Sequence, residues 1–263
     1  MSEFKGVNAV ITGSTTGIGL GIAEGLAASG MNVVINGLGS DEDKQQLSQR
    51  IETEHGVNAP VIDADLTRGS EARALIEKAV ERLGQVDVLV NNAGVQHVSR
   101  IEEFPEEKWD QIINLNLSAN FHTSKAALPG MRQHGYGRII NIASAHGLVA
   151  SPYKSAYVAA KHGVVGLTRT LGLEVAEEPD LTANAICPAY VRTPLVEGQI
   201  ADQAKAHNMS EEQVIRDVIL AAQPNKRFVT IDELVAFTRL LCSYQGRSFN
   251  GAALPMDGAW TAR

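Results

Sequence analysis

The stretch Val7-Asn-Ala-Val-Ile-Thr12-Gly-Ser-Thr-Thr-Gly17-Ile-Gly19 joins an apolar segment to a glycine-rich turn. Residues 7–12 predict a strand, and the small and apolar residues 17–29 predict a helix. Three residues separate Gly13 from Gly17, so the turn differs from the G-x-G-x-x-G pattern. Its glycines still allow a tight bend, and the amides that open the helix favour an anion. We therefore expect the turn to hold the pyrophosphate of a dinucleotide cofactor; the alternative is a glycine-rich connection without a ligand.

Strand-like and helix-like segments alternate along the whole chain, as in a parallel sheet covered by helices. No linker, repeat or low-complexity segment interrupts them. The pattern predicts one doubly wound α/β domain over residues 1–263, with strand order 3-2-1-4-5-6 and a seventh strand at the edge. The other expected strands are 32–36, 59–64, 86–90, 139–144, 182–186 and 252–256, and the other expected helices are 41–55, 71–83, 108–133, 155–173 and 230–243.

The composition is that of a globular protein, with 44% hydrophobic and 20% charged residues among 263. The 30 acidic and 23 basic residues give a net charge of −7, which argues against nucleic acid or an anionic membrane as partner. An anionic substrate would need a local cationic pocket. The two cysteines predict buried, reduced thiols. Because no signal-peptide pattern and no apolar run of ~20 residues is present, we expect a cytoplasmic protein without a membrane partner.

A second chemical signal lies in the segment from Ser144 to Lys161, where Tyr157 and Lys161 are four residues apart on the expected helix. That spacing puts both side chains on one face. A phenol has a pKa near ~10, and a neighbouring ammonium lowers it toward the range of a useful base. Ser144 ends a strand and can orient a substrate oxygen, while Ser155 is the expected N-cap of the helix. The alternative is a chance pair, because many helices carry Tyr and Lys at this spacing.

These segments together resemble the short-chain dehydrogenase/reductase family. The resemblance covers residues 6–260 and rests on Thr12–Gly19, Asn91-Asn92-Ala93-Gly94, Asn116, Ser144 and Tyr157-Val-Ala-Ala-Lys161. It implies a Rossmann domain with a seven-stranded sheet, a helical substrate lid at about 194–223, and oxidoreductase activity. It also implies four catalytic residues: Tyr157 as base, Lys161 as its electrostatic partner, Ser144 as substrate donor, and Asn116 marking a helix distortion that holds a relay water. The family commonly ends in Asp-Gly-Gly, where this chain has Asp257-Gly258-Ala259.

The same resemblance implies a nicotinamide cofactor. The residue after the second strand commonly selects the cofactor, acidic for NAD and basic for NADP. Here Asn36-Gly37-Leu38-Gly39 offers neither, and the nearest following cation is Lys44, so we expect NAD. Asp65 is expected beside the adenine, or alternatively as the cap of the next turn. The expected cofactor-binding residues are Gly13, Thr15, Gly17, Ile18, Gly19, Leu38, Asp65, Leu66, Asn92, Ala93, Gly94, Tyr157, Lys161, Pro188, Val191 and Thr193.

A narrower resemblance, to bacterial D-3-hydroxybutyrate dehydrogenases, lies in Gln96-His97, Ser144–Ser151, Lys154–Tyr157, Arg192–Val196 and Trp260–Arg263. It implies NAD-dependent oxidation of (R)-3-hydroxybutyrate, a small anionic hydroxy acid, to acetoacetate in a homotetramer. Four polar residues are expected at the carboxylate and Trp260 at the methyl end, although each polar residue is alternatively a solvated loop residue. The expected substrate-binding residues are Gln96, His146, Lys154, Gln199 and Trp260.

Other chemistries find less support. The segment Ile142-Ala-Ser144-Ala-His146 lacks the Gly-x-Ser-x-Gly elbow of a hydrolase. No His-x-x-x-His, Cys-x-x-Cys or Gly-x-x-x-x-Gly-Lys spacing occurs, so we expect neither a metal nor a P-loop. Two alternatives stay open: a reductase of another oxo or hydroxy substrate, such as a 3-oxoacyl thioester, and a non-catalytic cofactor-sensing protein of the same fold.

Overall fold

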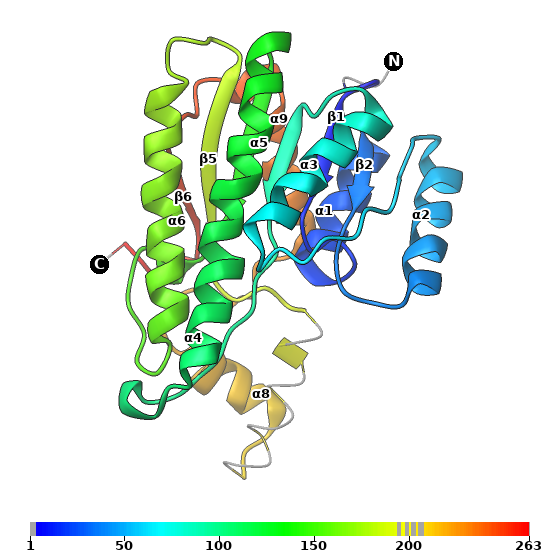
Figure 1. The fold of residues 1–263 in the computed structure, drawn as a ribbon. Coiled ribbons are helices and arrows are strands. Elements are labelled where there is room, and N and C mark those ends of the chain that lie inside the picture. The colour runs from blue at the N-terminus through cyan, green and yellow to red at the C-terminus, as the bar shows by residue number, and fades with distance from the viewer. Residues whose placement is uncertain (1–3, 194–195, 198–199, 201–203, 205–207, 263) are drawn as a thin grey trace.

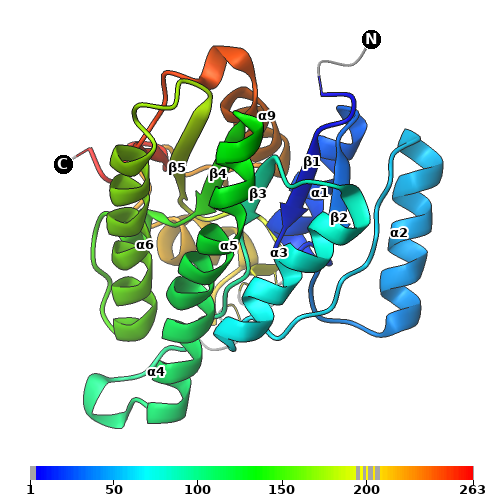
Figure 2. The ribbon, with the colours of Figure 1, turned by 45° about the horizontal axis from the view of Figure 1, so that its top comes forward.

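A computed structural model of the chain describes residues 4–193, 196–197, 200, 204 and 208–262. In this part of the chain six parallel strands form one sheet in the order β2-β1-β3-β4-β5-β6. Helices cover both faces, with α3, α5 and α6 on one side and α1 and α9 on the other (Figures 1 and 2). The strands are β1 (Asn8–Ile11), β2 (Asn32–Ile35), β3 (Val88–Asn91), β4 (Gly137–Ile142), β5 (Leu181–Pro188) and β6 (Ala253–Met256).

The helices follow the expected segments closely. None in the described ranges combines the length and apolar character that crossing a bilayer would require. The α-helices are α1 (Gly17–Ala28), α2 (Asp41–His55), α3 (Gly69–Leu83), α4 (Glu106–Ile113), α5 (Ala119–His134), α6 (Ser155–Glu174), α8 (Glu211–Val214) and α9 (Ile231–Cys242). Shorter helical turns are η1 (Ile101–Glu103), η2 (Asn114–Ser118), η3 (Ala145–Gly147), η4 (Ile215–Ile219) and η5 (Tyr244–Gly246).

The family-based count of seven strands needs one correction, at residues 59–64. This segment lies beside β2, but only the bridge between Ile35 and Val61 is regular. The main-chain N–H groups of Val33 and Ile35 still donate to the carbonyls of Asn58 and Pro60. Pro60 has no N–H to donate to the Val33 carbonyl, so the preceding bridge cannot form, although the Ile62 N–H still donates to the Ile35 carbonyl. The expected strand order is otherwise confirmed, with this segment in the place of its third strand.

Alternate residues of each central strand point to opposite faces of the sheet, because a strand has a period of two. In β1, Ala9 and Ile11 belong to the core shared with α1 and α9, whereas Val10 belongs to the core shared with α3 and α5. All three are fully buried. This two-sided burial explains why the strands are apolar. Because all the strand pairs are parallel, the carboxyl ends of β1, β3, β4 and β5 lie at one edge of the sheet.

The segment expected as one helix over 108–133 is interrupted where the resemblance implied a distortion. Its middle, η2, is a π-helical turn that contains Asn116 and separates α4 from α5. Asn116 is fully buried, and its Oδ1 and Nδ2 bond to the N–H and carbonyl of Val95, each at 2.9 Å. The Asn116 amide therefore joins this helical turn to the loop that leaves β3.

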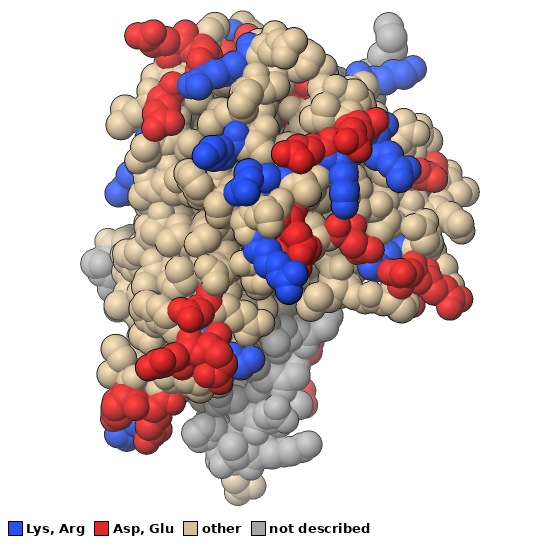
Figure 3. Space-filling view, viewed as in Figure 1, with Lys and Arg blue, Asp and Glu red and all other residues tan. Residues whose placement is uncertain are grey.

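Charged side chains of both signs are interspersed over α3 and α5, on the face shown in Figure 3. Acidic side chains gather lower on the same face, over η1 and α4. The exposed carboxylates of that cluster are Glu102, Glu103, Glu106, Glu107 and Asp110.

A buried polar network ties the sheet to the helices that carry the site. Asn91 of β3 donates to Asn141 Oδ1 of β4 at 2.9 Å and accepts from Thr123 of α5 at 2.7 Å. Asn141 in turn donates to Thr168 Oγ1 of α6 at 2.8 Å. Asn141 and both threonines are fully buried, so the network fixes α5 and α6 against the sheet below the catalytic segment.

Replacing Asn141 with alanine should therefore destabilise the protein. The change leaves a buried donor on Asn91 and a buried acceptor on Thr168 without their Asn141 partner, at a cost of about 2–3 kcal/mol in the free energy of unfolding. Urea unfolding measures this, and Thr170→Ala, at an exposed position of the same helix, is the control. A loss below about 0.5 kcal/mol, the size expected at a neutral surface position, would contradict a supporting role for the network.

Candidate active site

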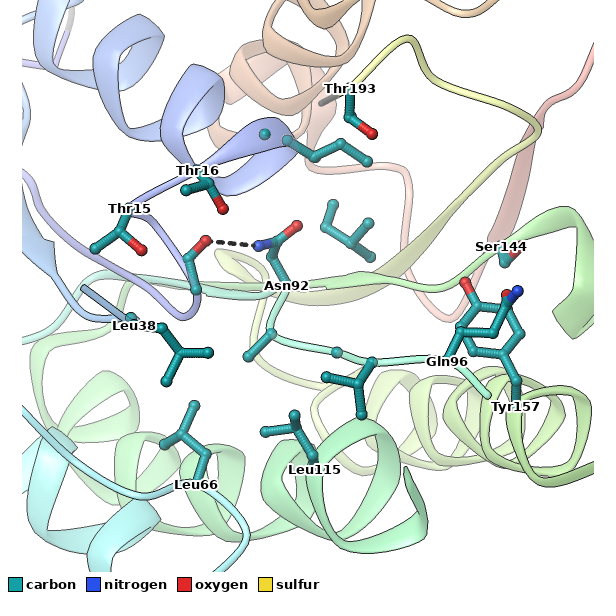
Figure 4. A pocket seen from close by; sticks show the side chains of 18 of the residues that line it. Thr15, Thr16, Leu38, Leu66, Asn92, Gln96, Leu115, Ser144, Tyr157 and Thr193 are labelled. Carbon is teal, nitrogen blue, oxygen red and sulfur yellow. Dashed lines mark hydrogen bonds between the residues drawn. The ribbon is translucent and has the colours of Figure 1, made fainter. Parts of the chain in front are cut away.

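A cavity of about 1020 Å³ opens at the carboxyl ends of the strands, where ligands bind in open α/β sheets. Figure 4 shows its two ends: Thr15, Thr16 and Leu38 lie at one, and Gln96, Ser144 and Tyr157 at the other. Most residues expected from the sequence line it. They are Gly13, Thr15, Gly17, Ile18, Leu38, Asp65, Leu66, Asn92, Ala93, Gly94, Gln96, Ser144, His146, Lys154, Tyr157, Lys161, Pro188, Val191, Thr193 and Trp260.

Two of the described residues expected at the site do not line this wall. Gly19 and Asn116 are buried behind it, and Gln199 lies outside the described residues. Gly19 serves the turn through close packing, because a Cβ there would overlap the carbonyl of Gly13 and the amide of Asn92. Substitution at Gly19 would therefore push the start of α1 away from the ends of β1 and β3.

The glycine turn presents the start of α1 to the cavity. Gly13 and Gly17 have φ values of +66° and +56°, which side chains rarely adopt. Thr16 is the N-cap of α1, but its side chain makes no capping hydrogen bond, so it leaves the first amides of the helix available to a ligand. A glycine cradle with exposed helix amides fits a pyrophosphate.

Asn92 holds this turn against the end of β3. Its Nδ2 donates to the carbonyls of Thr12 at 2.9 Å and Gly13 at 3.2 Å. Thr12 Oγ1 accepts in return from the backbone N–H groups of Asn92 and Ala93. The two segments, some eighty residues apart in the sequence, are thus fixed as one wall.

The end of the cavity beside the glycine turn, called the adenosine end after the cofactor expected from the sequence, carries both apolar and charged side chains. The Leu38 side chain is 88% exposed, and Figure 4 shows Leu38, Leu66 and Leu115 along this side of the cavity. Asp65 lines it too, but its Oδ1 accepts from both the backbone and the hydroxyl of Thr67, which lower the pKa of the Asp65 carboxyl. Asp65 thus closes the turn before α3, as in the alternative stated for it, while remaining on the cavity wall.

At the opposite end, β4 and α6 bring Ser144, Tyr157 and Lys161 together. The Lys161 Nζ lies 5.6 Å from the centre of the Tyr157 ring and donates to the Ile142 carbonyl at 2.6 Å. Ser144 Oγ accepts from the N–H of His146 at 3.1 Å. The three side chains come from two elements that the buried network joins.

Burial dominates the electrostatics of this group. It raises the pKa of Tyr157, a rise that the Ser144 side chain opposes through a hydrogen bond. Burial also lowers the pKa of Lys161 to about 8. Burial thus sets the direction of the shift of Tyr157 in this structure, and the expectation that Lys161 lowers the pKa of Tyr157 stays a prediction.

The predicted cap of α6 also needs correction. The helix begins at Ser155, as expected, but the N-cap position belongs to Lys154, which makes no side-chain capping bond. The Ser155 hydroxyl is buried and has no hydrogen-bond partner among the described residues. The loop before the helix therefore sets its start, with Tyr153 at a φ of +65° immediately before Lys154.

His146, Lys154 and Trp260 meet beside the catalytic group. The Lys154 Nζ lies 3.4 Å from His146 Nε2. The His146 ring meets the rings of Tyr157 and Trp260 edge-on, with ring centres 6.3 Å and 5.1 Å apart. Burial, followed by the Lys154 ammonium, lowers the pKa of His146 to about 4. Burial also lowers the pKa of Lys154. Gln96 faces the same end of the cavity (Figure 4).

Sequence reasoning missed Tyr190. Its ring stacks on Trp260 with centres 6.0 Å apart and planes 6° apart, and Lys154 Nζ lies 5.7 Å from its centre. The signal was present, since Tyr190 follows the end of β5 and directly precedes Val191, an expected cofactor residue. Leu115 was missed as well, although it neighbours Asn116 in η2.

A C-terminal turn holds Trp260 at the cavity. Asp257 accepts from the N–H of Ala259 at 3.0 Å and from the N–H of Thr261 at 2.9 Å. Ala259 has a φ of +71°, the left-handed conformation that glycine adopts without strain. The departure from Asp-Gly-Gly therefore keeps the glycine-like backbone while adding a methyl group.

The low pKa of His146 predicts a pH-dependent stability. Below pH 6.5 His146 is protonated in the unfolded chain, whereas in the folded chain it stays neutral down to about pH 4. Stability from this residue is complete above pH 6.5 and falls by about 3 kcal/mol as the pH drops to 4. Urea unfolding of wild type and His146→Asn should show their difference shift by this amount in favour of the variant between pH 7.5 and 4.5. His134→Asn, at an exposed helix end, is the control. A constant difference between wild type and His146→Asn would contradict the neutral, buried histidine.

Comparison with known proteins agrees with this geometry. Residues 7–204 match the family model described as short chain dehydrogenase. D-beta-hydroxybutyrate dehydrogenases from Rhizobium meliloti and Cupriavidus necator are 50% and 49% identical over 258 and 260 residues, covering at least 97% of each chain. An L-sorbose reductase from Gluconobacter frateurii, solved with NADPH and L-sorbose, superposes with a TM-score of 0.91 at 30% identity over 98% of both chains. The chain belongs to the short-chain dehydrogenase/reductase family and is an oxidoreductase.

Proposed function

We propose that this protein is an NAD-dependent dehydrogenase that reversibly oxidises (R)-3-hydroxybutyrate to acetoacetate. The observation that carries the proposal is the meeting of Lys154 and His146 beside Tyr157 inside the cavity. Relatives about 50% identical over nearly their whole length bear the name of this activity, which supports it. A homotetramer is part of the proposal on the resemblance alone, and a cytoplasmic location is part of it on the sequence expectation alone.

Lys154 is the group we assign to the substrate carboxylate. The chain carries a net charge of −7, so a small anion requires a local cation, and Lys154 provides one at the catalytic end. Burial disfavours the Lys154 ammonium, and an arriving carboxylate would offset that cost. His146 is neutral at physiological pH and orients the ammonium, while Gln96 adds an amide to the same end. Gln199 stays in the proposal through resemblance.

The catalytic end of the cavity suits a short substrate. Trp260 and Tyr190 stack on each other and, with His146, form an aromatic border next to the ammonium. A four-carbon hydroxy acid can place its carboxylate on Lys154, its methyl group against Trp260 and its hydroxyl toward Tyr157. A 3-oxoacyl thioester offers no carboxylate for this lysine, and we therefore rank that substrate second.

A bound nicotinamide cofactor would supply the acceptor for the hydride that leaves C3 of the substrate. The residues of the chain handle the proton. Tyr157 accepts the hydroxyl proton, and Ser144 holds the hydroxyl oxygen in line. Lys161 stabilises the phenolate and binds the nicotinamide ribose. Asn116 holds the relay water, as the resemblance implies, so that the proton can leave. One C–H and one O–H bond break, and the products are acetoacetate, NADH and a proton.

Tyr157→Phe should remove the base without removing the fold. The variant lacks only the hydroxyl, so its melting temperature and its NADH affinity should match those of the wild type. Its kcat should fall at least ~10²-fold, the usual contribution of a positioned acid–base group. Steady-state NAD reduction measures the loss, and fluorescence titration measures NADH binding. Turnover near the wild-type rate would show that another group takes the proton.

The substrate is tested by NAD reduction with (R)- and (S)-3-hydroxybutyrate, with a neutral secondary alcohol and the methyl ester as comparisons. We expect the R acid to be the best substrate. Lys154→Met should lower kcat/KM for it at least ~10-fold, with a rise in KM, because the carboxylate is bound in ground and transition states alike. The methyl ester should be a poor substrate that loses nothing further in this variant.

Lys78→Met, at an exposed position of α3, is the matched control and should leave both substrates unchanged. Activity on neither enantiomer, together with good activity on the neutral alcohol, would overturn the assignment of substrate. An equal loss on acid and ester would show that Lys154 supports the site without binding the carboxylate.

A further inference from the structure

A lysine is built into the wall at the adenosine end of the cavity. Lys44 lies in the first turn of α2, and its side chain is only 7% exposed. It lines the cavity together with Gly37, Leu38 and Asp63. The other cations that line the described wall, Lys154 and Lys161, belong to the catalytic end.

The charge of Lys44 is already engaged by two carboxylates. Its Nζ lies 2.6 Å from Asp63 Oδ1 and 3.0 Å from Asp41 Oδ1. These hydrogen bonds, that of Asp63 first, raise the pKa of Lys44. One ammonium and two carboxylates leave this part of the wall with a net negative charge. Lys44 is the only lysine among the described residues that line this end, and both carboxylates pair with it. The described wall therefore offers no unpaired lysine to a ligand at this end.

Asp63 is the more important of the two partners. It comes from the segment that follows the bridge to β2, nineteen residues from Lys44, and it makes the shorter contact. Asp41 is one turn away on the same helix and its side chain is 91% exposed, so water competes strongly for it. Asp63 also lines the cavity itself.

We propose that Asp63 is a specificity-determining residue, which holds Lys44 away from the cofactor and so makes the site reject the 2′-phosphate of NADP. NADP differs from NAD by this phosphate on the adenosine ribose. A lysine released beside Leu38 would pair with the phosphate, whereas the lysine bound to Asp63 cannot. The inference rests on the proposed preference for NAD. It assigns that preference to the pairing of Lys44 with Asp63, because the usual selector position carries the uncharged Leu38.

The test is binding of NADH and NADPH in the absence of substrate, followed by cofactor fluorescence. Asp63→Asn keeps the shape of the side chain and removes its charge. We expect its affinity for NADPH relative to NADH to rise roughly tenfold, the size of one charge-assisted hydrogen bond. Lys44→Met in the Asp63→Asn background should abolish this gain. Glu42→Gln, which removes a charge from the same turn but bonds to Gln46 and not to Lys44, is the matched control and should leave the ratio unchanged.

Two results would overturn the proposal. No gain for NADPH in a folded Asp63→Asn variant, checked by thermal melting, would show that Lys44 cannot reach the phosphate. An equal gain with and without Lys44 would assign the effect to repulsion by Asp63 alone. The affinities of the wild-type protein test the cofactor preference by themselves. Equal affinity for NADH and NADPH would refute the proposed preference for NAD, whatever the variants do.

Discussion

The side-chain hydrogen bond between Asn91 and Asn141 sets the spacing of the whole site. Asn91 ends β3, and the next residues form the wall that locks the glycine turn; Asn141 lies in β4, which leads directly to Ser144. Through Thr123 and Thr168 the same bond reaches α5 and α6, and α6 carries Tyr157 and Lys161. A cofactor wall and a catalytic group from four elements are therefore held by amides and hydroxyls that satisfy one another away from water.

The pKa values of the basic side chains shift in opposite directions at the two ends of the cavity. At the catalytic end burial dominates: it lowers the pKa values of Lys161, Lys154 and His146, so that positive charge there is unfavourable until an anion arrives. At the adenosine end the carboxylates of Asp63 and Asp41 raise the pKa of Lys44 and satisfy its charge within the protein. This contrast supports the proposals that one end binds a small anionic substrate and that the other turns the phosphate of NADP away.

Much of this arrangement was readable in the sequence because it depends on local pattern. The glycine turn and the strand order follow from short motifs and periodicity, and the family resemblance implied the distorted turn that contains Asn116. The failures are non-local or depend on a single atom. Pro60 removed a strand by lacking one N–H, and the burial of Tyr157, which raises its pKa, comes from packing that no motif reveals. Tyr190 was missed because its partner, Trp260, lies seventy residues away, and the pairing of Lys44 with Asp63 required the folded register of β2 with residues 58–62.

The two prolines at the margins of the sheet have a consequence for association between molecules. Beside Pro60, the outward N–H and carbonyl of Ala59 are occupied by Glu52 and Ser48 of α2. On the other margin, the carbonyls of Ala252 and Met256 bond toward β5, so Pro255 between them faces outward and lacks an N–H there. Neither margin presents an unbroken row of donors and acceptors on which the strand of another molecule could pair. A central sheet of apolar parallel strands is thus closed to edge-to-edge growth on both sides, which protects it from aggregation through strand addition.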